Sequence, residues 1–438
     1  METVMDSTSL EVFLGNRFGI FVHFGLYSVA ARHEWVQTLE EIDSETYQLY
    51  FENFNPDLLN PKEWAAKLKS YGCKYVILTT KHHEGFCLWD TQYTDFKITN
   101  TSYGKDLIRE LVDELRKVGI RIGFYYSLID WHHPDFTIDG YHPLRNRLEA
   151  YHENRDMSKY RQYMKDQLTE LLTAYGEIDY LFFDFSYESR VWQHSVGKGS
   201  IDWGSEALET LILELQPQIL INDRLGLGRG IQTPEQFSKS DTSDIPWETV
   251  QTLNNSWGYD RDNANFKDST MVIKQLVDTV SKNGNFVMNI GPTGRGTFDD
   301  VSHSILTDVG KWLTVNGISI YNAKASDFTP PKDCRYTQKG NKLYLHLFSW
   351  PYRTILLPEL GGKVRFARLL SDGSEVRFVE RSQISGDRKS TDNLYKEVTE
   401  VHLKEAISPE TLVLNLPIKQ PDKQVTVIEL TLKEEGNG

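Results

Sequence analysis

Three segments of the chain repeat the same order of hydrophobic and polar positions. In each, apolar residues recur with the spacing of an amphipathic helix, a glycine follows, and a run of β-branched or aromatic residues comes next. A glycine just past a helix accepts the left-handed backbone that ends many helices, so each segment predicts a helix followed by a strand. The segments are WAAKLKSYGCKYVILTT at 64–80, LVDELRKVGIRIGFYYS at 111–127 and LTELLTAYGEIDYLFFD at 168–184.

Further apolar runs predict additional strands: FGIFVHFG at 18–25, QILINDR at 218–224 and NFVMNIG at 285–291. Strands that are apolar throughout and alternate with helices indicate a parallel sheet covered on both faces. Functional groups at successive strand ends are typical of a (β/α)8 barrel rather than an open sheet. We therefore expect an α/β fold with a (β/α)8-like barrel over residues 1–330. The polar strand ends are His23, Lys81 to His83, Tyr125 to Ser127, Asp184, Asn222 to Arg224 and Asn289.

The pattern changes after about Tyr321. Short alternating runs such as NKLYLHLFSW and VTVIELTL are separated by Gly, Pro, Asp and Asn, without a helical period between them. This pattern predicts an antiparallel β-sandwich over residues 331–438. The pair Pro330–Pro331 suits the boundary between the two domains.

Composition narrows the classes of function. Hydrophobic residues make up 39% and charged residues 25% of the 438 positions, which is typical of a globular chain with a substantial core. Asp and Glu outnumber Lys and Arg by 62 to 48, and no basic run suits a phosphate backbone, so we expect no nucleic-acid partner. No stretch approaches the roughly 20 apolar residues of a membrane span. No Gly-rich phosphate loop follows the first predicted strand, which argues against nucleotide binding.

The compartment and the oligomeric state stay open. Cys73, Cys87 and Cys334 have no spacing for a disulfide framework or a zinc site, and we expect them to be buried thiols. The first residues lack the basic start and the apolar stretch of a signal peptide. A periplasmic or secreted location would require a signal peptide that has been removed, and otherwise we expect the protein in the cytoplasm.

Asp184, within the segment DYLFFDFS at 179–186, is a candidate for chemistry. A single carboxylate after four bulky apolar residues is costly to bury unless it is paired. At the carboxyl end of a barrel strand it would lie at the mouth of the barrel, where a partly desolvated carboxylate can take part in catalysis. The alternative is a structural Asp that caps the next helix or pairs with an arginine.

Histidines and aromatic residues indicate a site for a sugar or another polyol. His23, His82 and His83 end strands, and a neutral imidazole offers hydroxyl groups one donor and one acceptor. Adjacent residues on an extended strand point to opposite faces, so we do not expect His82 and His83 to share a metal ion. Flat rings near predicted loops can pack on the C–H face of a sugar, although ordinary packing explains some of them. These rings are Trp35, Trp89, Trp131, Trp247 and Trp257.

Glycoside hydrolysis requires two carboxyl groups. Glu34, Glu235 and Glu248 are the candidates beside Asp184, and position alone does not choose among them. Arg224 could form a structural ion pair, or it could hold a catalytic carboxylate ionised and oriented.

Seven motifs follow one another between about Arg17 and Asn322: RFGIFVHFGLYSV, Glu34-Trp35, YVILTTKHHEGFCLWD, GFYYSLIDWHHPDF, INDR, SWGY and NGNFVMNIGPTGRG. As a set and in this order they resemble the α-L-fucosidases of glycoside hydrolase family 29. The resemblance implies a (β/α)8-like barrel with a C-terminal β domain. It also implies hydrolysis of terminal α-L-fucose from fucosylated oligosaccharides or glycoconjugates, with retention of configuration and without a metal or organic cofactor.

The resemblance further implies roles for single residues. Asp184 matches the nucleophile, and Arg224 matches the arginine that contacts it. Glu235, in a TPE context similar to the family's acid-bearing loop, is preferred as the acid/base over Glu248, which we expect in a structural strand. Tyr126 competes with Tyr125 for one contact, because only one of the two can face inward. The positions that match fucose-binding residues are His23, Glu34, Trp35, His82, His83, Tyr125 and Trp257.

Four positions depart from the family pattern without removing a catalytic group. The family usually has Trp at the positions of Phe24 and Phe182, Asp at Glu84 and Gly at Phe185. We expect Phe182 and Phe185 to reshape the floor of the pocket. Two alternatives to a fucosidase also stay open: a protein that binds fucose or a galacto-configured sugar without catalysis, and a glycosidase for a related sugar.

Overall fold

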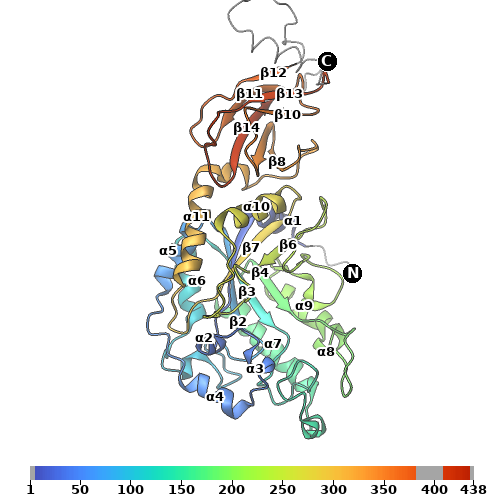
Figure 1. The fold of residues 1–438 in the computed structure, drawn as a ribbon. Coiled ribbons are helices and arrows are strands. Elements are labelled where there is room, and N and C mark those ends of the chain that lie inside the picture. The colour runs from blue at the N-terminus through green and yellow to red at the C-terminus, as the bar shows by residue number, and fades with distance from the viewer. Residues whose placement is uncertain (1–4, 381–407, 435–438) are drawn as a thin grey trace, which may run out of the picture. The chain divides into compact units, whose positions relative to one another are not determined.

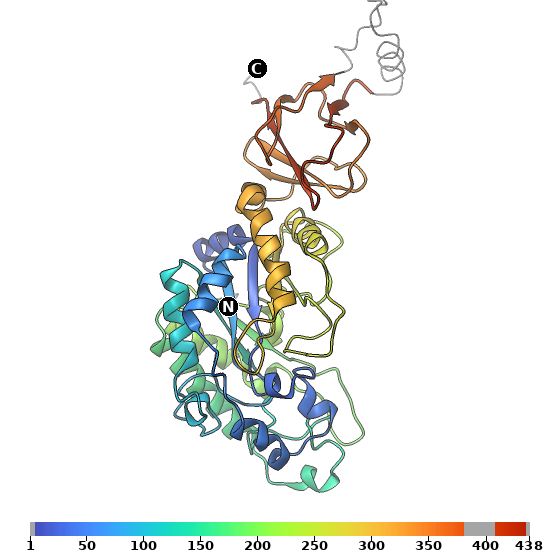
Figure 2. The same cartoon turned by 60° about the vertical axis from the view of Figure 1, so that its left-hand side comes forward.

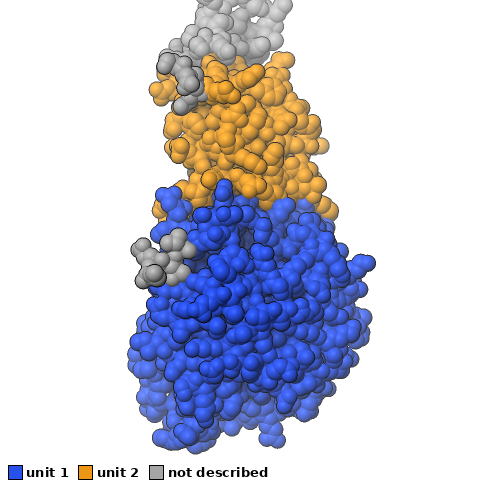
Figure 3. All heavy atoms as spheres, turned by 180° about the vertical axis from the view of Figure 1, so that it is seen from behind, with its two compact units in different colours: residues 1–238, 243–268, 284–310 blue, residues 239–242, 269–283, 311–438 orange. Residues whose placement is uncertain are grey.

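Two units make up the structure, a computed structural model that describes residues 5–380 and 408–434. The predicted domain boundary between residues 330 and 331 stays a prediction. The first unit comprises residues 1–238, 243–268 and 284–310, and the second comprises residues 239–242, 269–283 and 311–438 (Figure 3).

The first unit is built on a parallel seven-stranded sheet with the order β5-β4-β3-β2-β1-β7-β6 (Figure 1). The six strands predicted from the apolar runs are all present, and their bounds are β1 Phe18–Val22, β2 Tyr75–Lys81, β3 Arg121–Ser127, β4 Tyr180–Asp184, β5 Leu220–Ile221 and β7 Asn285–Ile290. The seventh strand, β6 Glu248–Gln251, begins at Glu248, which was expected in a strand.

The two edges of this sheet, β5 and β6, are joined by an extended segment at residues 231–236. Ile231 pairs in parallel with Asn222, which follows β5 directly. On its other side the segment pairs in parallel with the β6 region, through Gln232 with Trp247 and Glu235 with Val250. Because β1 also pairs with β7, the ring of parallel pairing is complete, as a (β/α)8-like barrel requires.

Helices lie on the outside of the strands, as α5, α6, α7 and α9 show in Figures 1 and 2. The helices α5, α6 and α7 are followed by Gly72, Gly119 and Gly176, all with a φ near +70 to +90° as predicted (89°, 71° and 72°). The bounds are α1 Ser7–Asn16, α2 Tyr27–Ala30, α3 Val36–Leu39, α4 Ser44–Glu52, α5 Pro61–Ser70, α6 Leu107–Lys117, α7 Met157–Ala174, α8 Ser200–Trp203 and α9 Ser205–Leu215.

The barrel interior is filled by every second residue of its strands. On β4, Tyr180 and Phe182 belong to the interior cluster, and Asp184 continues the same alternation at the carboxyl end. Phe13 of α1 packs against Tyr75 and Tyr180, the first residues of their strands, and so covers the amino ends. The middle of the interior is therefore apolar, and buried carboxyl groups lie at both of its ends, Asp184 where β4 ends and Glu248 where β6 begins.

The second unit contains antiparallel strands in two sheets, a three-stranded sheet with the order β10-β13-β12 and a four-stranded sheet with the order β11-β14-β9-β8. Leucines and other apolar side chains from both sheets form one core cluster, as in a β-sandwich. The bounds are α10 Ser269–Val280, β8 Cys334–Lys339, β9 Lys342–Leu347, β10 Thr354–Leu357, β11 Val364–Leu369, β12 Phe378–Glu380, β13 Leu412–Asn415 and β14 Thr426–Leu432, and α11 Asp300–Asn316 runs from the first unit into the second.

The predicted fold class is confirmed, with a (β/α)8-like barrel and C-terminal antiparallel sheets. Among the residues that the structure describes, no helix is both long enough and apolar enough to cross a bilayer. The three cysteines are buried and free, as expected.

Candidate active site

A pocket with an empty volume of about 360 Å³ opens at the carboxyl ends of the barrel strands. Every residue that the family resemblance matched to catalysis or fucose binding lines it, whereas the other candidates, Glu248, Trp89, Trp131 and Trp247, do not. Phe21, Phe182, Phe185 and Val250 complete the lining. The predicted residues in the lining are His23, Glu34, Trp35, His82, His83, Tyr125, Asp184, Arg224, Glu235 and Trp257.

Asp184 is the last residue of β4 and is 8% exposed. Its Oδ1 accepts a 2.6 Å hydrogen bond from Nη1 of Arg224, and its Oδ2 accepts a 2.9 Å hydrogen bond from the Tyr125 hydroxyl. These two donors stabilise the carboxylate without water. The cost of burying the charge after four apolar residues is offset in this way, and the free carboxylate surface faces the pocket.

Tyr125, rather than Tyr126, reaches the pocket. Tyr125 pairs with Phe182 across β3 and β4, and Ser127 pairs with Asp184, so these four residues share the inner face. The Tyr126 hydroxyl points outward and donates to Gln167 of α7.

One guanidinium joins the two carboxylates considered for catalysis. Arg224 donates from Nη2 to Oε2 of Glu235 at 2.9 Å, while its Nη1 holds Asp184. Burial acts to lower the pKa of Arg224, but the neighbouring carboxylates of Asp184 and Glu235 raise it overall. The guanidinium also lies 5.2 Å from the ring centre of Phe182, which forms part of the pocket floor.

Glu248, the alternative acid/base, lies at the opposite end of the barrel. It is the first residue of β6 and is fully buried. Its carboxyl group accepts hydrogen bonds from the hydroxyls of Tyr75 and Tyr180, each at 2.8 Å, and both tyrosines begin their strands. Burial raises the pKa of Glu248 to about 7. This carboxyl group is not part of the pocket lining.

The pocket histidines are neutral imidazoles. Burial lowers the pKa of His23 to about 3, and burial together with His83 lowers the pKa of His82 well below its ordinary value. His23 Nδ1 lies 2.7 Å from Oδ1 of Asn289, whose amide nitrogen donates to the carbonyl of Trp257. Because Oδ1 can only accept, His23 carries its proton on Nδ1 and presents a bare Nε2.

His82 and His83 do not point to opposite faces, so the expectation from strand alternation was wrong. The strand β2 ends at Lys81, and the two histidines follow it, where alternation no longer applies. Their ring centres lie 4.1 Å apart, and both rings line the pocket. Within residues 5–380 and 408–434, no group of three His, Cys, Asp or Glu side chains is arranged to hold a metal ion.

Glu34 ties the loop before α3 to the segment that carries Trp257. Its Oε2 accepts hydrogen bonds from the backbone nitrogens of Trp257 and Gly258, at 3.0 and 2.8 Å. Its Oε1 lies 3.4 Å from Nδ1 of His33 but has no hydrogen-bond partner in the described part of the chain, and Nδ1 of His82 is likewise buried without one. Buried polar atoms without partners are costly, so both atoms suit hydroxyl groups of a bound ligand.

Aromatic rings form one wall of the pocket. The ring of Trp35 packs against His83, Trp131 and Phe185, with ring centres 4.9, 5.5 and 5.1 Å apart. Phe185 has a φ of +76°, a conformation that glycine adopts without strain. The family's usual glycine at this position fits that backbone, and here the ring adds to the wall instead. Trp89 and Trp247 are buried away from the pocket.

A second and wider cavity adjoins the pocket, with an empty volume of about 1080 Å³. Tyr141, Tyr187, Glu188 and Arg190 are among its lining residues. Sequence reasoning missed these residues, because they lie in irregular segments without a motif. The residues that line both cavities are Asp184, Phe185, Arg224 and Glu235.

Comparison with known proteins identifies the family. The model of the family described as alpha-L-fucosidase matches residues 2–318. The chain belongs to this family. Alpha-L-fucosidase isoenzyme 1 from Paenibacillus thiaminolyticus is 41% identical, with a TM-score of 0.87 over 97% of this chain and 99% of that one. The fucosidase of Bacteroides thetaiotaomicron, solved as a trapped covalent intermediate, is 26% identical with a TM-score of 0.81 over 99% and 98% of the two chains. The human tissue alpha-L-fucosidase is 29% identical over 80% of this chain and 78% of its own length.

Proposed function

We propose that this member of the alpha-L-fucosidase family hydrolyses terminal α-L-fucose by double displacement, with Asp184 as nucleophile and Glu235 as acid/base. The observation that carries the proposal is the shared ion pair: Arg224 holds both carboxylates at the carboxyl ends of the strands. A retaining glycosidase needs two carboxyl groups on either side of one glycosidic bond. The related structure trapped as a covalent intermediate supports the same reaction class.

The first step is attack of Asp184 on the anomeric carbon. Arg224 and Tyr125 each donate a hydrogen bond to the carboxylate and so fix the orientation of its oxygens. Glu235, when protonated, gives its proton to the leaving oxygen, so that the departing alcohol is neutral. The glycosyl–oxygen bond breaks as the bond to Asp184 forms.

The second step releases the sugar. Glu235, now ionised, removes a proton from water, which attacks the anomeric carbon and displaces Asp184. Two inversions at one carbon retain its configuration. We expect the two carboxyl groups to lie about 5–5.5 Å apart in the complex with substrate.

The remaining residues of the pocket bind the sugar. Buried acceptors and neutral imidazoles match a ring with several hydroxyls, and flat rings match its apolar C–H face. We assign hydroxyl binding to His23, Glu34, His82 and His83. We assign the apolar contacts to Trp35 and Trp257.

The leaving group is the remainder of a fucosylated oligosaccharide or glycoconjugate. Glu235 lines both cavities, so the group that receives its proton extends into the wider one. There the half-buried ring of Tyr141 and the exposed charges of Glu188 and Arg190 face that group. A flat ring beside polar groups suits a sugar better than an apolar alcohol.

Hydrolysis of an aryl α-L-fucoside tests the proposal. The wild-type protein should release 4-nitrophenol from its fucoside, and Asp184→Ala should abolish release. Azide, which can reach the anomeric carbon in the space left by the carboxylate, should partly restore turnover. Unchanged turnover in Asp184→Ala would exclude it as the nucleophile, and absence of turnover in the wild type would favour a protein that binds sugar without catalysis.

A further inference from the structure

The hydroxyl of Ser127, the last residue of β3, determines where His83 carries its proton. Ser127 Oγ lies 2.6 Å from Nδ1 of His83, 2.7 Å from the Ile129 carbonyl oxygen and 3.1 Å from the Ile129 nitrogen. A hydroxyl has one proton and two lone pairs. The carbonyl oxygen can only accept, so the single proton of Ser127 points to it. The two lone pairs are left for the Ile129 N–H and for a proton on Nδ1 of His83.

His83 is therefore an imidazole with a bare Nε2. Burial, to which Lys81 and Arg224 add, lowers the pKa of His83 to about 3, so the ring carries one proton at neutral pH. With that proton on Nδ1, Nε2 can only accept. Trp35 and Phe185, each with its ring centre 4.9 Å from that of His83, pack edge-on against the imidazole and oppose a flip of the ring.

The bare nitrogen faces a second acceptor. Nε2 of His83 lies 3.8 Å from Oδ2 of Asp184, and neither atom has a proton to offer the other. A ligand atom that contacts both must be a donor. Because Asp184 is assigned to attack the anomeric carbon, the nearest sugar donor is the hydroxyl on the adjacent carbon, C2.

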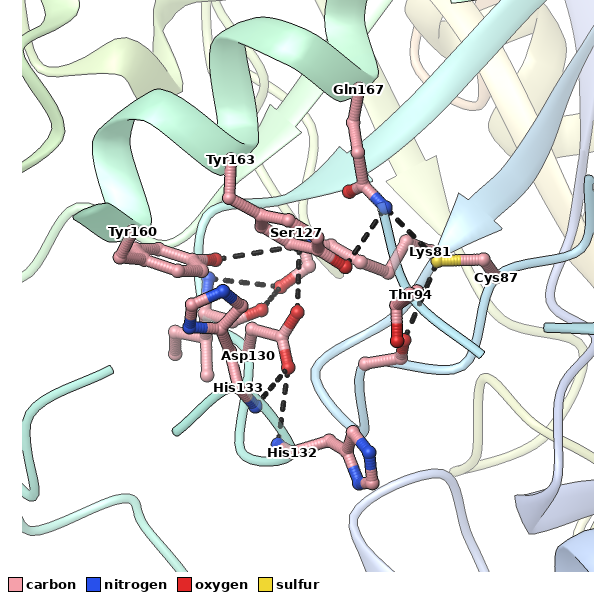
Figure 4. Close-up of polar contacts among 12 residues, drawn as sticks. Lys81, Cys87, Thr94, Ser127, Asp130, His132, His133, Tyr160, Tyr163 and Gln167 are labelled. Carbon is pink, nitrogen blue, oxygen red and sulfur yellow. Dashed lines mark hydrogen bonds and ion pairs between the residues drawn. The ribbon is translucent and has the colours of Figure 1, made fainter. Parts of the chain in front are cut away.

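A buried ion pair between Lys81 and Asp130 holds the loop that follows Ser127 (Figure 4). Lys81, the residue before His82, donates to Oδ2 of Asp130 at 3.0 Å, and both side chains are almost fully buried. Oδ1 of Asp130 accepts from the backbone nitrogens of His132 and His133, at 3.1 and 2.9 Å. The Trp131 nitrogen donates to the His83 carbonyl at 2.8 Å. Two contacts, from Lys81 to Asp130 and from Trp131 to the His83 carbonyl, thus fix the end of β2 to the loop after β3 near the His83–Ser127 contact.

We propose that Ser127 is a positioning residue that fixes the proton of His83 on Nδ1, so that Nε2 accepts a hydrogen bond from the C2 hydroxyl of the bound sugar. The identity of the sugar rests on the proposed function. The position of the proton in the free protein does not depend on the proposed function. The role of Ser127 and the proposed function can therefore fail separately.

The proton position is measured on the free wild-type protein. ¹⁵N spectra of protein labelled at histidine distinguish a protonated from a bare ring nitrogen, and loss of signals in His83→Gln assigns the ring. We expect a protonated Nδ1 and a bare Nε2 at neutral pH. A proton on Nε2 would overturn the proposal, whether or not the protein hydrolyses fucosides and whether or not any Ser127 variant folds.

The use of Nε2 is tested by comparing an aryl α-L-fucoside with its 2-deoxy analogue. Ser127→Ala frees His83 to exchange its proton between the two nitrogens. It should lower kcat/KM for the fucoside about tenfold, as expected for the loss of a hydrogen bond of ordinary strength. The change in kcat/KM for the 2-deoxy analogue should be much smaller, because this substrate lacks the C2 hydroxyl. The ratio of the two values should therefore shrink about tenfold. Equal losses on both substrates would mean a structural role only and would overturn the proposal.

Ser319→Ala is the matched control. Ser319 is also fully buried and also donates to a backbone carbonyl, that of Asn316 at 2.6 Å, but it belongs to the second unit. This variant should leave the ratio of the two substrates unchanged. A ratio that shrinks equally in both variants would contradict a specific role for Ser127.

Discussion

Arg224 donates a 2.9 Å hydrogen bond to Glu235 in the free protein. A general acid must give its proton to the leaving oxygen when the glycosidic bond breaks, and here Oε2 of Glu235 is turned to the guanidinium instead. The side chain of Glu235 is 41% exposed, so it has room to leave Arg224 when a leaving group enters the wider cavity. The ion pair therefore belongs to the site without substrate. We expect Glu235 to turn from Arg224 to the leaving oxygen when substrate binds.

Glu235→Ala should lower activity by an amount that depends on the leaving group of the substrate. For a fucosylated oligosaccharide, whose leaving alcohol needs a proton, kcat/KM should fall by about 10²–10⁴-fold. For fucosyl fluoride, whose leaving group needs much less assistance, the loss should be far smaller. Steady-state kinetics on the two substrates measures the difference.

Glu248→Gln is the matched control for this experiment. It removes the competing carboxyl group at the amino end of the barrel and should retain activity on both substrates. If Glu248→Gln instead loses the oligosaccharide activity while Glu235→Ala keeps it, the assignment of the acid/base is wrong.

Glu248 should also make stability depend on pH. Burial raises its pKa from 4.5 to about 7, so the folded state binds its proton more tightly than the unfolded chain does. The stabilisation is fully present below pH 4.5 and is lost as pH rises to about 7, by about 3 kcal/mol. Relative to Glu248→Gln, the wild type should therefore lose unfolding free energy over this range, as measured by urea denaturation at several pH values. A difference that does not change with pH would refute this.

The ion pair of Lys81 and Asp130 should be costly to break from one side. Lys81→Met leaves the Asp130 carboxylate buried without its cation and should lower the unfolding free energy by about 3–5 kcal/mol. In the double variant Lys81→Met, Asp130→Asn, the buried charge is gone and the amide oxygen can still accept from the backbone nitrogens of His132 and His133. Most of the lost stability should return, and a double variant less stable than Lys81→Met alone would contradict this account.

Hydrophobic patterning was sufficient to predict the parallel strands and the position of Asp184, and the polar residues at successive strand ends indicated a barrel. The repeated helix–strand pattern depends on local periodicity and on the glycines that end helices, and both can be recognised in a single sequence. Patterning could not decide whether Tyr125 or Tyr126 faces inward, because strands buried on both faces are apolar at every position. The pairing of Ser127 with Asp184 and the hydrogen bond from Tyr125 to Asp184 show which residues of β3 face inward.

The wider arrangement of the site depended on contacts that have no local signal. His82 and His83 were expected on opposite faces because the end of β2 at Lys81 could not be located to one residue. The preference for Glu235 came from the family resemblance, since nothing in its own neighbourhood shows that residues 231–236 pair with both β5 and β6 regions. The tautomer of His83 likewise depends on three distances around one hydroxyl.

The most direct test of the central role of Asp184 is to trap the covalent intermediate. Incubation with 2-fluoro-fucosyl fluoride, followed by digestion and mass spectrometry, should find one fluorofucosyl group per chain on the peptide that contains Asp184. The same treatment of Asp184→Ala should leave that peptide unlabelled. A label on a different residue, or turnover of fucosides with no trapped adduct, would contradict the account.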